Sequence, residues 1–167
     1  MITLTPVIEN YRNKNLTFTG GFGYVGSAIL SRLIPSLNNL NVVSRNHDNP
    51  FGVNVLFSQN LFDEKLWDRI VEESDVIFHL AGNTSLEWAE HHQEDSLELA
   101  ILPIKRFRDS CIRKNKFPRF IFASTVTVYG SDYQGVINEE KTPHPESIYD
   151  LHKIFSEEYL RYCSKNV

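Results

Sequence analysis

Tyr149 and Lys153 stand four residues apart in a stretch with a helical pattern, so their side chains should lie on one face of the helix. A phenol is a poor base at neutral pH, because its unperturbed pKa is about 10. A neighbouring ammonium group favours the phenolate and should lower the pKa of Tyr149 toward the working range of a general acid or base. On spacing alone, the two residues could equally be a surface pair on an amphipathic helix.

Three glycines end a short apolar run and precede a second helical pattern. They are Gly20, Gly23 and Gly26, in the stretch LTFTGGFGYVG from Leu16 to Gly26. A strand that ends in so tight a turn leaves backbone N–H groups at the start of the next helix, where the helix dipole also favours an anion. The spacing therefore predicts a dinucleotide pyrophosphate over the turn. The alternative is a glycine-rich connection without a ligand.

The composition is that of an ordinary globular protein of one domain. The chain has 167 residues, of which 41% are hydrophobic and 23% charged, and its formal net charge is −4. This charge gives no reason to expect nucleic acid or an acidic membrane as a partner. The sequence lacks an apolar run long enough for a membrane span, and it begins without a secretion signal. Because Cys111 and Cys163 fit a reducing compartment and the six histidines form no ligand set with them, we expect a cytoplasmic protein without a metal.

The elements that position these residues follow from the alternation of apolar runs and helical patterns. We expect a polar lead-in over residues 1–14, packed loosely on the surface, and one NAD(P)-binding domain over residues 15–167. The strands predicted from apolar runs are Leu16–Phe18, Leu40–Val43, Val53–Phe57, Asp75–Leu80 and Arg119–Ser124. The predicted helices are Tyr24–Leu33, Phe62–Val71, a helix that begins within Leu86–Asp95 and runs toward Lys114, and Tyr149–Tyr162. Pro103 should kink or break the third helix.

Strands that alternate with helices predict an α/β fold, a Rossmann-like doubly wound parallel sheet with helices on both faces. The crossovers should be right-handed. We expect the strand order 3-2-1-4-5, with the ligand crevice at the carboxyl ends of the first and fourth strands.

Five motifs, in order, resemble the extended short-chain dehydrogenase/reductase family of NAD-dependent nucleotide-sugar epimerases, dehydratases and reductases. TGGFGYVG at 19–26 resembles the cofactor fingerprint of that family, and FHLAG at 78–82 its fourth-strand motif. Asn60-Leu61 stands where the family often has an aspartate and an aliphatic residue against the adenine. IFASTVTVYG at 121–130 resembles the fifth-strand motif, and Tyr149 to Lys153 is a Tyr-x-x-x-Lys pair.

The resemblance implies a role for individual residues. Thr125, Tyr149 and Lys153 would be catalytic, and Ser124 would contact the substrate. Thr125 and Tyr149 would hold a substrate hydroxyl, Tyr149 would move its proton, and Lys153 would bind the nicotinamide ribose. Thr125 could donate to the substrate oxygen or accept from it. The implied cofactor-binding residues are Gly20, Gly23, Tyr24, Val25, Gly26, Ser44, Arg45, Asn60, Leu61, Leu80, Ala81, Gly82, Tyr149 and Lys153.

The sequence departs from the family's pattern in three places. Ser44-Arg45 ends the second strand where NAD-binding members usually have an acidic residue on the adenine ribose. A guanidinium accommodates a ribose 2′-phosphate better, so the cofactor is NADP or NAD and we favour NADP. The alternative is a solvated arginine in a loop. Val126-Thr127 replaces the Asp-Glu of the 4,6-dehydratases, which argues against that chemistry, and Ala100 stands where a helix asparagine is common.

Members of the family continue past the Tyr-x-x-x-Lys helix into a small carboxyl-terminal substrate domain, which is missing from this chain. A shortened fragment, a truncated gene product and a split protein would share this sequence. We expect the cofactor-binding part of an NAD(P)-dependent nucleotide-sugar epimerase or reductase, catalytically incompetent by itself, with hydride transfer at a sugar carbon. The alternative is a non-catalytic dinucleotide-binding module or a truncated inactive homologue.

The resemblance also implies a homodimer through the helices near residues 86–114 and 149–162. The first of these regions is more apolar than a solvated helix needs. Its apolar residues are Leu97, Leu99, Ile101, Leu102 and Ile104.

Overall fold

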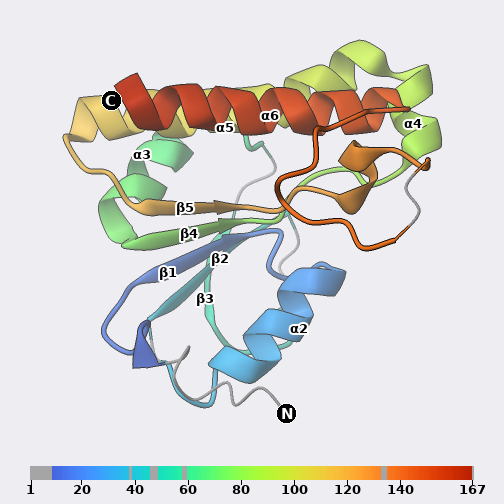
Figure 1. Cartoon of the computed structure of the whole chain (residues 1–167). Coiled ribbons are helices and arrows are strands. Elements are labelled where there is room, and N and C mark those ends of the chain that lie inside the picture. Colours follow the sequence, from blue (N-terminus) through green and yellow to red (C-terminus); the bar gives the residue numbers. More distant parts are fainter. Residues whose placement is uncertain (1–8, 38, 46–48, 58–59, 133–134, 167) are drawn as a thin grey trace. The chain divides into compact units, whose positions relative to one another are not determined.

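The computed structural model describes residues 9–37, 39–45, 49–57, 60–132 and 135–166. The chain forms two compact units (Figure 1). The first, the sheet unit, contains Met1–Ala81 and Asp109–Ala123. The second, the helical unit, contains Gly82–Arg108 and Ser124–Val167.

The sheet unit is built on five parallel strands. They are β1 (Leu16–Thr19), β2 (Leu40–Ser44), β3 (Asn54–Phe57), β4 (Val76–His79) and β5 (Arg119–Phe122). Their order is β3-β2-β1-β4-β5, with β1 between β2 and β4. This confirms the predicted strand order and the Rossmann-like α/β fold. The last residues of neighbouring strands lie side by side, since Thr19 pairs with Val43 on one side and His79 on the other.

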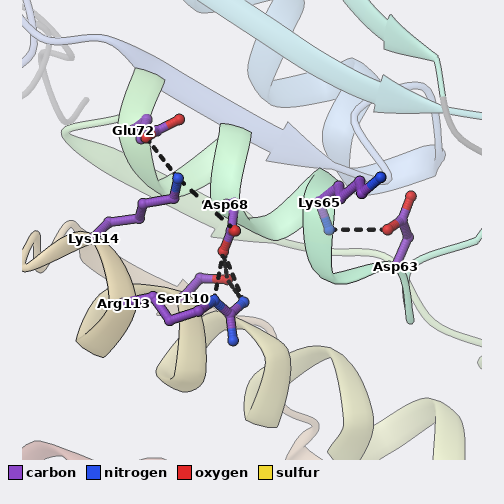
Figure 2. Close-up of polar contacts among 7 residues, drawn as sticks. All are labelled: Asp63, Lys65, Asp68, Glu72, Ser110, Arg113 and Lys114. Atoms are coloured by element: carbon purple, nitrogen blue, oxygen red, sulfur yellow. Dashed lines mark hydrogen bonds and ion pairs between the residues drawn. The ribbon is translucent and has the colours of Figure 1, made fainter.

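Two helices of the sheet unit, α2 (Tyr24–Leu33) and α3 (Glu64–Glu73), lie on opposite faces of the sheet (Figure 1). α2 has the predicted bounds. α3 begins two residues later than predicted, because the side chain of Asp63 accepts from the backbone N–H of Lys65 at 2.9 Å and so caps the helix there (Figure 2).

The core of the sheet unit contains the inward side chains of the central strands and α2. Phe18 stacks on Phe78 with ring centroids 4.5 Å apart. The ring of Tyr11 meets Phe78 edge-on at 6.1 Å and packs against the same core. The expectation of a loosely packed lead-in is therefore wrong at Tyr11, because its aromatic ring covers apolar surface at the edge of the core. Residues 1–8 lie outside the described residues.

A cluster of polar side chains joins α3 to the end of α5 within the sheet unit (Figure 2). Asp68 accepts from the Oγ of Ser110 at 2.7 Å and from Nη2 of Arg113 at 2.7 Å. Lys114 pairs with Glu72 at 2.8 Å. The hydrogen bond from Arg113 is the main reason why the pKa of Asp68 lies below its ordinary value.

The helical unit contains α4 (Leu86–His91), most of α5 (Gln93–Lys114, with residues from Asp109 on in the sheet unit), the short 3₁₀ helix η1 (Val126–Tyr129) and α6 (Ile148–Asn166). The prediction that Pro103 breaks the third helix is wrong. α5 runs through Pro103, and the interruption lies at His92. Pro103 and Ile104 are both buried, so packing offsets the one hydrogen bond that a proline cannot donate.

α6 lies beside the first part of α5 in the helical unit. The Oγ of Ser96 and Nδ1 of His152 are 2.9 Å apart, and both side chains are buried. The Oγ of Ser156 donates to the carbonyl of Ala100 at 3.2 Å. Burial lowers the pKa of His152, so this contact joins a hydroxyl to a neutral imidazole at neutral pH.

The two cysteines of the chain are reduced and buried. Cys111 belongs to the sheet unit and Cys163 to the helical unit. In the part of the chain that the structure describes, no helix is long and apolar enough to cross a membrane. Among the same residues, no group of three or more histidine, cysteine or acidic side chains could hold a metal ion.

Candidate functional site

The glycine turn after β1 is shaped by close backbone approaches. Gly20 has φ +73°, and a Cβ there would lie 2.7 Å from the backbone nitrogen of Ala81. A Cβ on Gly26 would lie 2.5 Å from the carbonyl oxygens of Gly20 and Gly21. Only glycine fits at both positions, since real Cβ atoms do not approach backbone atoms so closely. The turn therefore brings the end of β1 against Ala81 and seats α2 directly on the turn.

The first turn of α2 faces solvent. Gly23 is the N-cap residue in an extended conformation, and Tyr24 and Val25 are 96% and 53% exposed. Among the described residues, no side chain caps this helix and its first turn carries no acidic residue. The first backbone N–H groups of a helix lack partners within it and attract an anion. The turn thus fits the pyrophosphate of a dinucleotide.

A buried polar pair supports the turn from β1 and β4, and sequence reasoning missed it. The Oγ1 of Thr19 lies 2.7 Å from Nδ1 of His79 and accepts from the backbone N–H of Ala81 at 3.4 Å. The backbone N–H of Leu80 donates to the carbonyl of Thr19 at 3.0 Å. Thr19 and His79 are polar residues at the ends of otherwise apolar runs, and this pattern could have predicted the pair. It fixes the Leu80-Ala81 backbone beside Gly20.

The other implied cofactor residues stand at the ends of β2, β3 and β4. Ser44 is the last residue of β2, and Arg45 follows it as an exposed side chain. The Oδ1 of Asn60 accepts from the N–H of Phe62 at 2.7 Å, so this side chain stabilises the turn before α3. The carbonyl of Leu61 accepts from Nε1 of Trp67 at 2.7 Å.

Gly82 is the exposed first residue of the helical unit. A Cβ added to it would meet no described atom within 4 Å. Packing therefore does not require a glycine at this position, and the role of Gly82 in cofactor binding stays a prediction.

Tyr149 and Lys153 lie on one face of α6, as the spacing predicts. The Nζ of Lys153 is 5.7 Å from the centre of the Tyr149 ring. The expected lowering of the Tyr149 pKa is not found. Burial raises the pKa of Tyr149 and the charge of Asp150 raises it further, whereas burial lowers the pKa of Lys153. Tyr149 is thus a neutral phenol at neutral pH, because burial and the adjacent carboxylate both disfavour the phenolate.

A cavity of about 340 Å³ lies in the helical unit, beside the segment that follows β5. The described residues that line it are Ser124, Thr125, Val126, Val128, Tyr129, Ile137, Asn138, Glu139 and Glu157. Tyr149 and Lys153 are not among these lining residues. The structure thus brings Ser124 and Thr125 together on one cavity wall.

Two carboxylates that sequence reasoning missed connect to the hydroxyls of this wall, one directly and one through Thr127. The Oγ of Ser124 donates to Glu157. The Oγ1 of Thr125 lies 2.8 Å from the Oγ1 of Thr127, which in turn donates to Asp150. Glu157 stands four residues after Lys153 on α6, and this spacing was a signal that could have found it.

The sequence model of the NAD-dependent epimerase/dehydratase family matches residues 16–167. This match confirms the family that the five motifs indicated. A D-erythronate dehydrogenase from Haemophilus influenzae is 27% identical over 154 residues, which are 85% of this chain and 47% of that protein. An uncharacterized UDP-glucose epimerase from Bacillus subtilis is 29% identical over 156 residues, 83% of this chain and 48% of that protein.

Among solved structures, a UDP-glucose 4-epimerase from Thermotoga maritima, determined with UDP-glucose, superposes with a TM-score of 0.77 at 27% identity. The superposition covers 91% of this chain and 52% of that one. The chain therefore spans about half the length of the curated relatives it matches.

Proposed function

Because this chain belongs to the NAD-dependent epimerase/dehydratase family, we propose that it is the cofactor-binding part of a nucleotide-sugar epimerase or reductase. The observation that carries the proposal is the turn from Gly20 to Gly26. Its backbone leaves no room for a Cβ at Gly20 or Gly26, and α2 begins without a side-chain cap among the described residues. An anion at this helix start would gain both hydrogen bonds and the helix dipole.

The bound nicotinamide cofactor would accept a hydride from a sugar carbon or return one to it. The backbone at the start of α2 would hold the pyrophosphate. Arg45 would bind a ribose 2′-phosphate, so we propose NADP as the preferred cofactor. The exposed guanidinium next to Ser44, in the place of a carboxylate, supports this preference.

Tyr149 would exchange the proton that accompanies the hydride. In the reducing direction, a carbonyl carbon receives the hydride while the neutral Tyr149 gives its proton to the carbonyl oxygen. In the oxidising direction, the phenolate takes the proton of the alcohol. Because the pKa of Tyr149 is raised, the phenol already carries the proton that it would donate in the reducing direction.

The proposed substrate is a nucleotide sugar, in keeping with the UDP-glucose epimerase names of the relative from Bacillus subtilis and the structure from Thermotoga maritima. Another relative is named a D-erythronate dehydrogenase, so the names of the relatives also include an acid as a substrate. We place the protein in the cytoplasm, where the two reduced thiols would persist.

A homodimer through α5 and α6 is part of the proposal. Leu97 on α5 and Phe155 and Tyr162 on α6 are exposed apolar side chains. Ile104, also expected at this surface, is buried within the unit and would not contribute.

Calorimetric titration of the chain with NADPH and NADH tests the cofactor half of the proposal. We expect binding of both, with NADPH tighter, and loss of binding in Gly23→Val while the circular dichroism spectrum is retained. If Gly23→Val unfolds, Gly23→Ala is the milder variant, since its Cβ would lie 3.2 Å from the Gly20 carbonyl. Absence of binding to the wild-type chain contradicts the proposal.

The enzymatic half is tested with UDP-glucose by following both the near-ultraviolet absorbance of the reduced cofactor and the formation of an epimerised UDP-sugar, because an epimerase returns the hydride and leaves no net reduced cofactor. Turnover that disappears in Tyr149→Phe supports hydride transfer. Cofactor binding without turnover is the result expected of a cofactor-binding part that is incompetent by itself, and turnover that persists in Tyr149→Phe contradicts the role of Tyr149.

A further inference from the structure

Lys153 stands between two side chains on its own face of α6. Tyr149 is four residues before it and Glu157 four residues after it, and residues at this spacing are neighbours on a helix. The Nζ of Lys153 is 5.7 Å from the centre of the Tyr149 ring. A phenol, an ammonium group and a carboxylate therefore form one row along α6.

The proposed reaction needs a positive charge in the middle of this row. When Tyr149 gives its proton to a carbonyl oxygen it becomes a phenolate, and a neighbouring ammonium group stabilises that anion. A deprotonated Lys153 would offer only a neutral amine. Burial lowers the pKa of Lys153 and so works against the charged form. An interaction that favours the ammonium group would therefore widen the pH range in which the reaction can proceed.

Glu157 is held where its charge can supply this interaction. The Oγ of Ser124, in the segment after β5, donates to Oε1 of Glu157, so the carboxylate is fixed from outside α6. All three residues belong to the helical unit. The charge of Glu157 raises the pKa of Lys153 and opposes the effect of burial. Glu157 thus acts on the same property of Lys153 that burial weakens.

The next residue of α6 offers a matched comparison. Glu158 has the same side chain, but it is exposed and accepts from Arg161. Successive residues of a helix point about 100° apart, so Glu158 lies outside the row of Tyr149 and Lys153. A carboxylate at this position carries the same charge without the hydrogen bond from Ser124 that fixes Glu157.

We propose that Glu157 is a positioning residue of the site, which acts through Lys153 and keeps it in the ammonium form beside Tyr149. Ser124 holds the carboxylate of Glu157 in place. The inference rests on the proposed function for the part that Lys153 plays in the reaction. The effect of Glu157 on Lys153 can be measured in the chain without any ligand.

Titration of the lysine side chains, followed by carbon NMR, tests this effect directly. The signal that disappears in Lys153→Arg identifies Lys153. We expect Lys153 to titrate at a lower pH in Glu157→Gln than in the wild-type chain, because the variant still accepts from Ser124 but has lost the charge. Glu158→Gln removes the same charge one residue later and should leave the titration unchanged. Equal titrations of Lys153 in Glu157→Gln and the wild type overturn the inference.

Removal of the Ser124 hydroxyl separates the charge of Glu157 from its placement. Ser124→Ala leaves the carboxylate on α6 but releases it from the segment after β5. We expect Lys153 to titrate at a lower pH than in the wild type, with a smaller shift than in Glu157→Gln, since the charge remains nearby. A shift as large as that of Glu157→Gln contradicts the charge of Glu157 as the source.

The pH dependence of NADPH binding tests the consequence for the site. Calorimetric titration gives the ratio of the affinities at neutral pH and at about pH 9. For Glu157→Gln we expect this ratio to be about threefold larger than for the wild type, because the charged hydrogen bond from Lys153 to the nicotinamide ribose is lost at a lower pH. The ratio compares one variant with itself, so the overall change of charge cancels.

A charge that does not titrate separates this role from a structural one. In Lys153→Arg the guanidinium keeps its charge at both pH values, so adding Glu157→Gln should leave the ratio unchanged. A ratio that changes equally with lysine and with arginine at this position overturns the inference. If the wild-type chain does not bind NADPH, the proposed function fails, and the titration of Lys153 still decides whether Glu157 acts on it.

Discussion

The glycine turn of the sheet unit and the cavity wall that Ser124 and Thr125 form in the helical unit are specified in different ways. The turn is made of backbone that leaves no space for a Cβ at Gly20 or Gly26, and both glycines lie within one short stretch. The wall is made of side chains whose partners are distant in sequence, 23 residues between Thr127 and Asp150 and 33 between Ser124 and Glu157. A site made of backbone depends on shape, whereas a site made of hydroxyls depends on which partner takes each hydrogen.

The largest expected effect comes from filling the space at the glycine turn. Gly26→Ala should lower the free energy of unfolding by about 3 kcal/mol, because the new methyl group would meet two carbonyl oxygens that cannot move apart without shifting β1 or α2. Urea denaturation measures the change. Gly82→Ala is the control, since no described atom lies within 4 Å of the added carbon, and it should cause no loss. Equal effects of the two variants would remove the distinction between a turn specified by shape and an ordinary loop.

Loss of the charged side chain of Arg45 should have a smaller effect, and it should weaken the binding of only one cofactor. Arg45→Ala should weaken NADPH binding by about 1–3 kcal/mol, the scale of a lost charge-assisted hydrogen bond, and leave NADH nearly unchanged. Calorimetric titration with both cofactors gives the two values. Equal losses would mean that Arg45 acts on the fold of the loop and not on the 2′-phosphate.

The polar cluster around Asp68 shows what a partly exposed side-chain network contributes to the sheet unit. Asp68→Asn should lower the free energy of unfolding by about 1 kcal/mol at neutral pH, since the ion pairs with Arg113 and Lys114 remain accessible to water.

The pH dependence of this effect follows from the lowered pKa of Asp68. A carboxyl with a lower pKa in the folded chain stabilises the fold above its unfolded pKa of about 3.9, and that stabilisation is lost as the pH falls through the folded value. The difference between wild type and variant should hold from neutral pH to about pH 4 and vanish on further acidification. A difference that grows in acid would contradict the ion pairs as its source.

The smallest effect concerns the titration of Tyr149 in the helical unit. Ultraviolet titration of the phenols should show that Tyr149→Phe removes a component above the ordinary tyrosine pKa of about 10. Asp150→Asn should lower the pKa of Tyr149 but leave it raised, because burial is the larger cause. If Tyr149 titrates below the other tyrosines, the interpretation that the ammonium group of Lys153 lowers its pKa would be correct.

The sequence could predict features that depend on neighbouring residues, but not those that depend on contacts between distant residues. The strand order, the bounds of α2 and the glycine turn could be read from local patterns, because apolar runs and glycine spacing act over a few residues. The unbroken α5 could not, because the burial of Pro103 depends on distant packing. The direction of the Tyr149 pKa shift could not be read from its spacing to Lys153 either, since it depends on burial and on the charge of Asp150.

The placement of the cysteines has an experimental consequence. Each unit carries one thiol, Cys111 or Cys163, and both are shielded from solvent. A thiol reagent can attack only after a local opening, so the labelling rate of each cysteine reports the opening equilibrium of its own unit. Mass spectrometry of the two peptides, after a timed exposure of the unmodified chain, would measure both equilibria in one sample. Equal rates that follow the global denaturation curve would identify a single cooperative transition, and unequal rates would identify the unit that opens first.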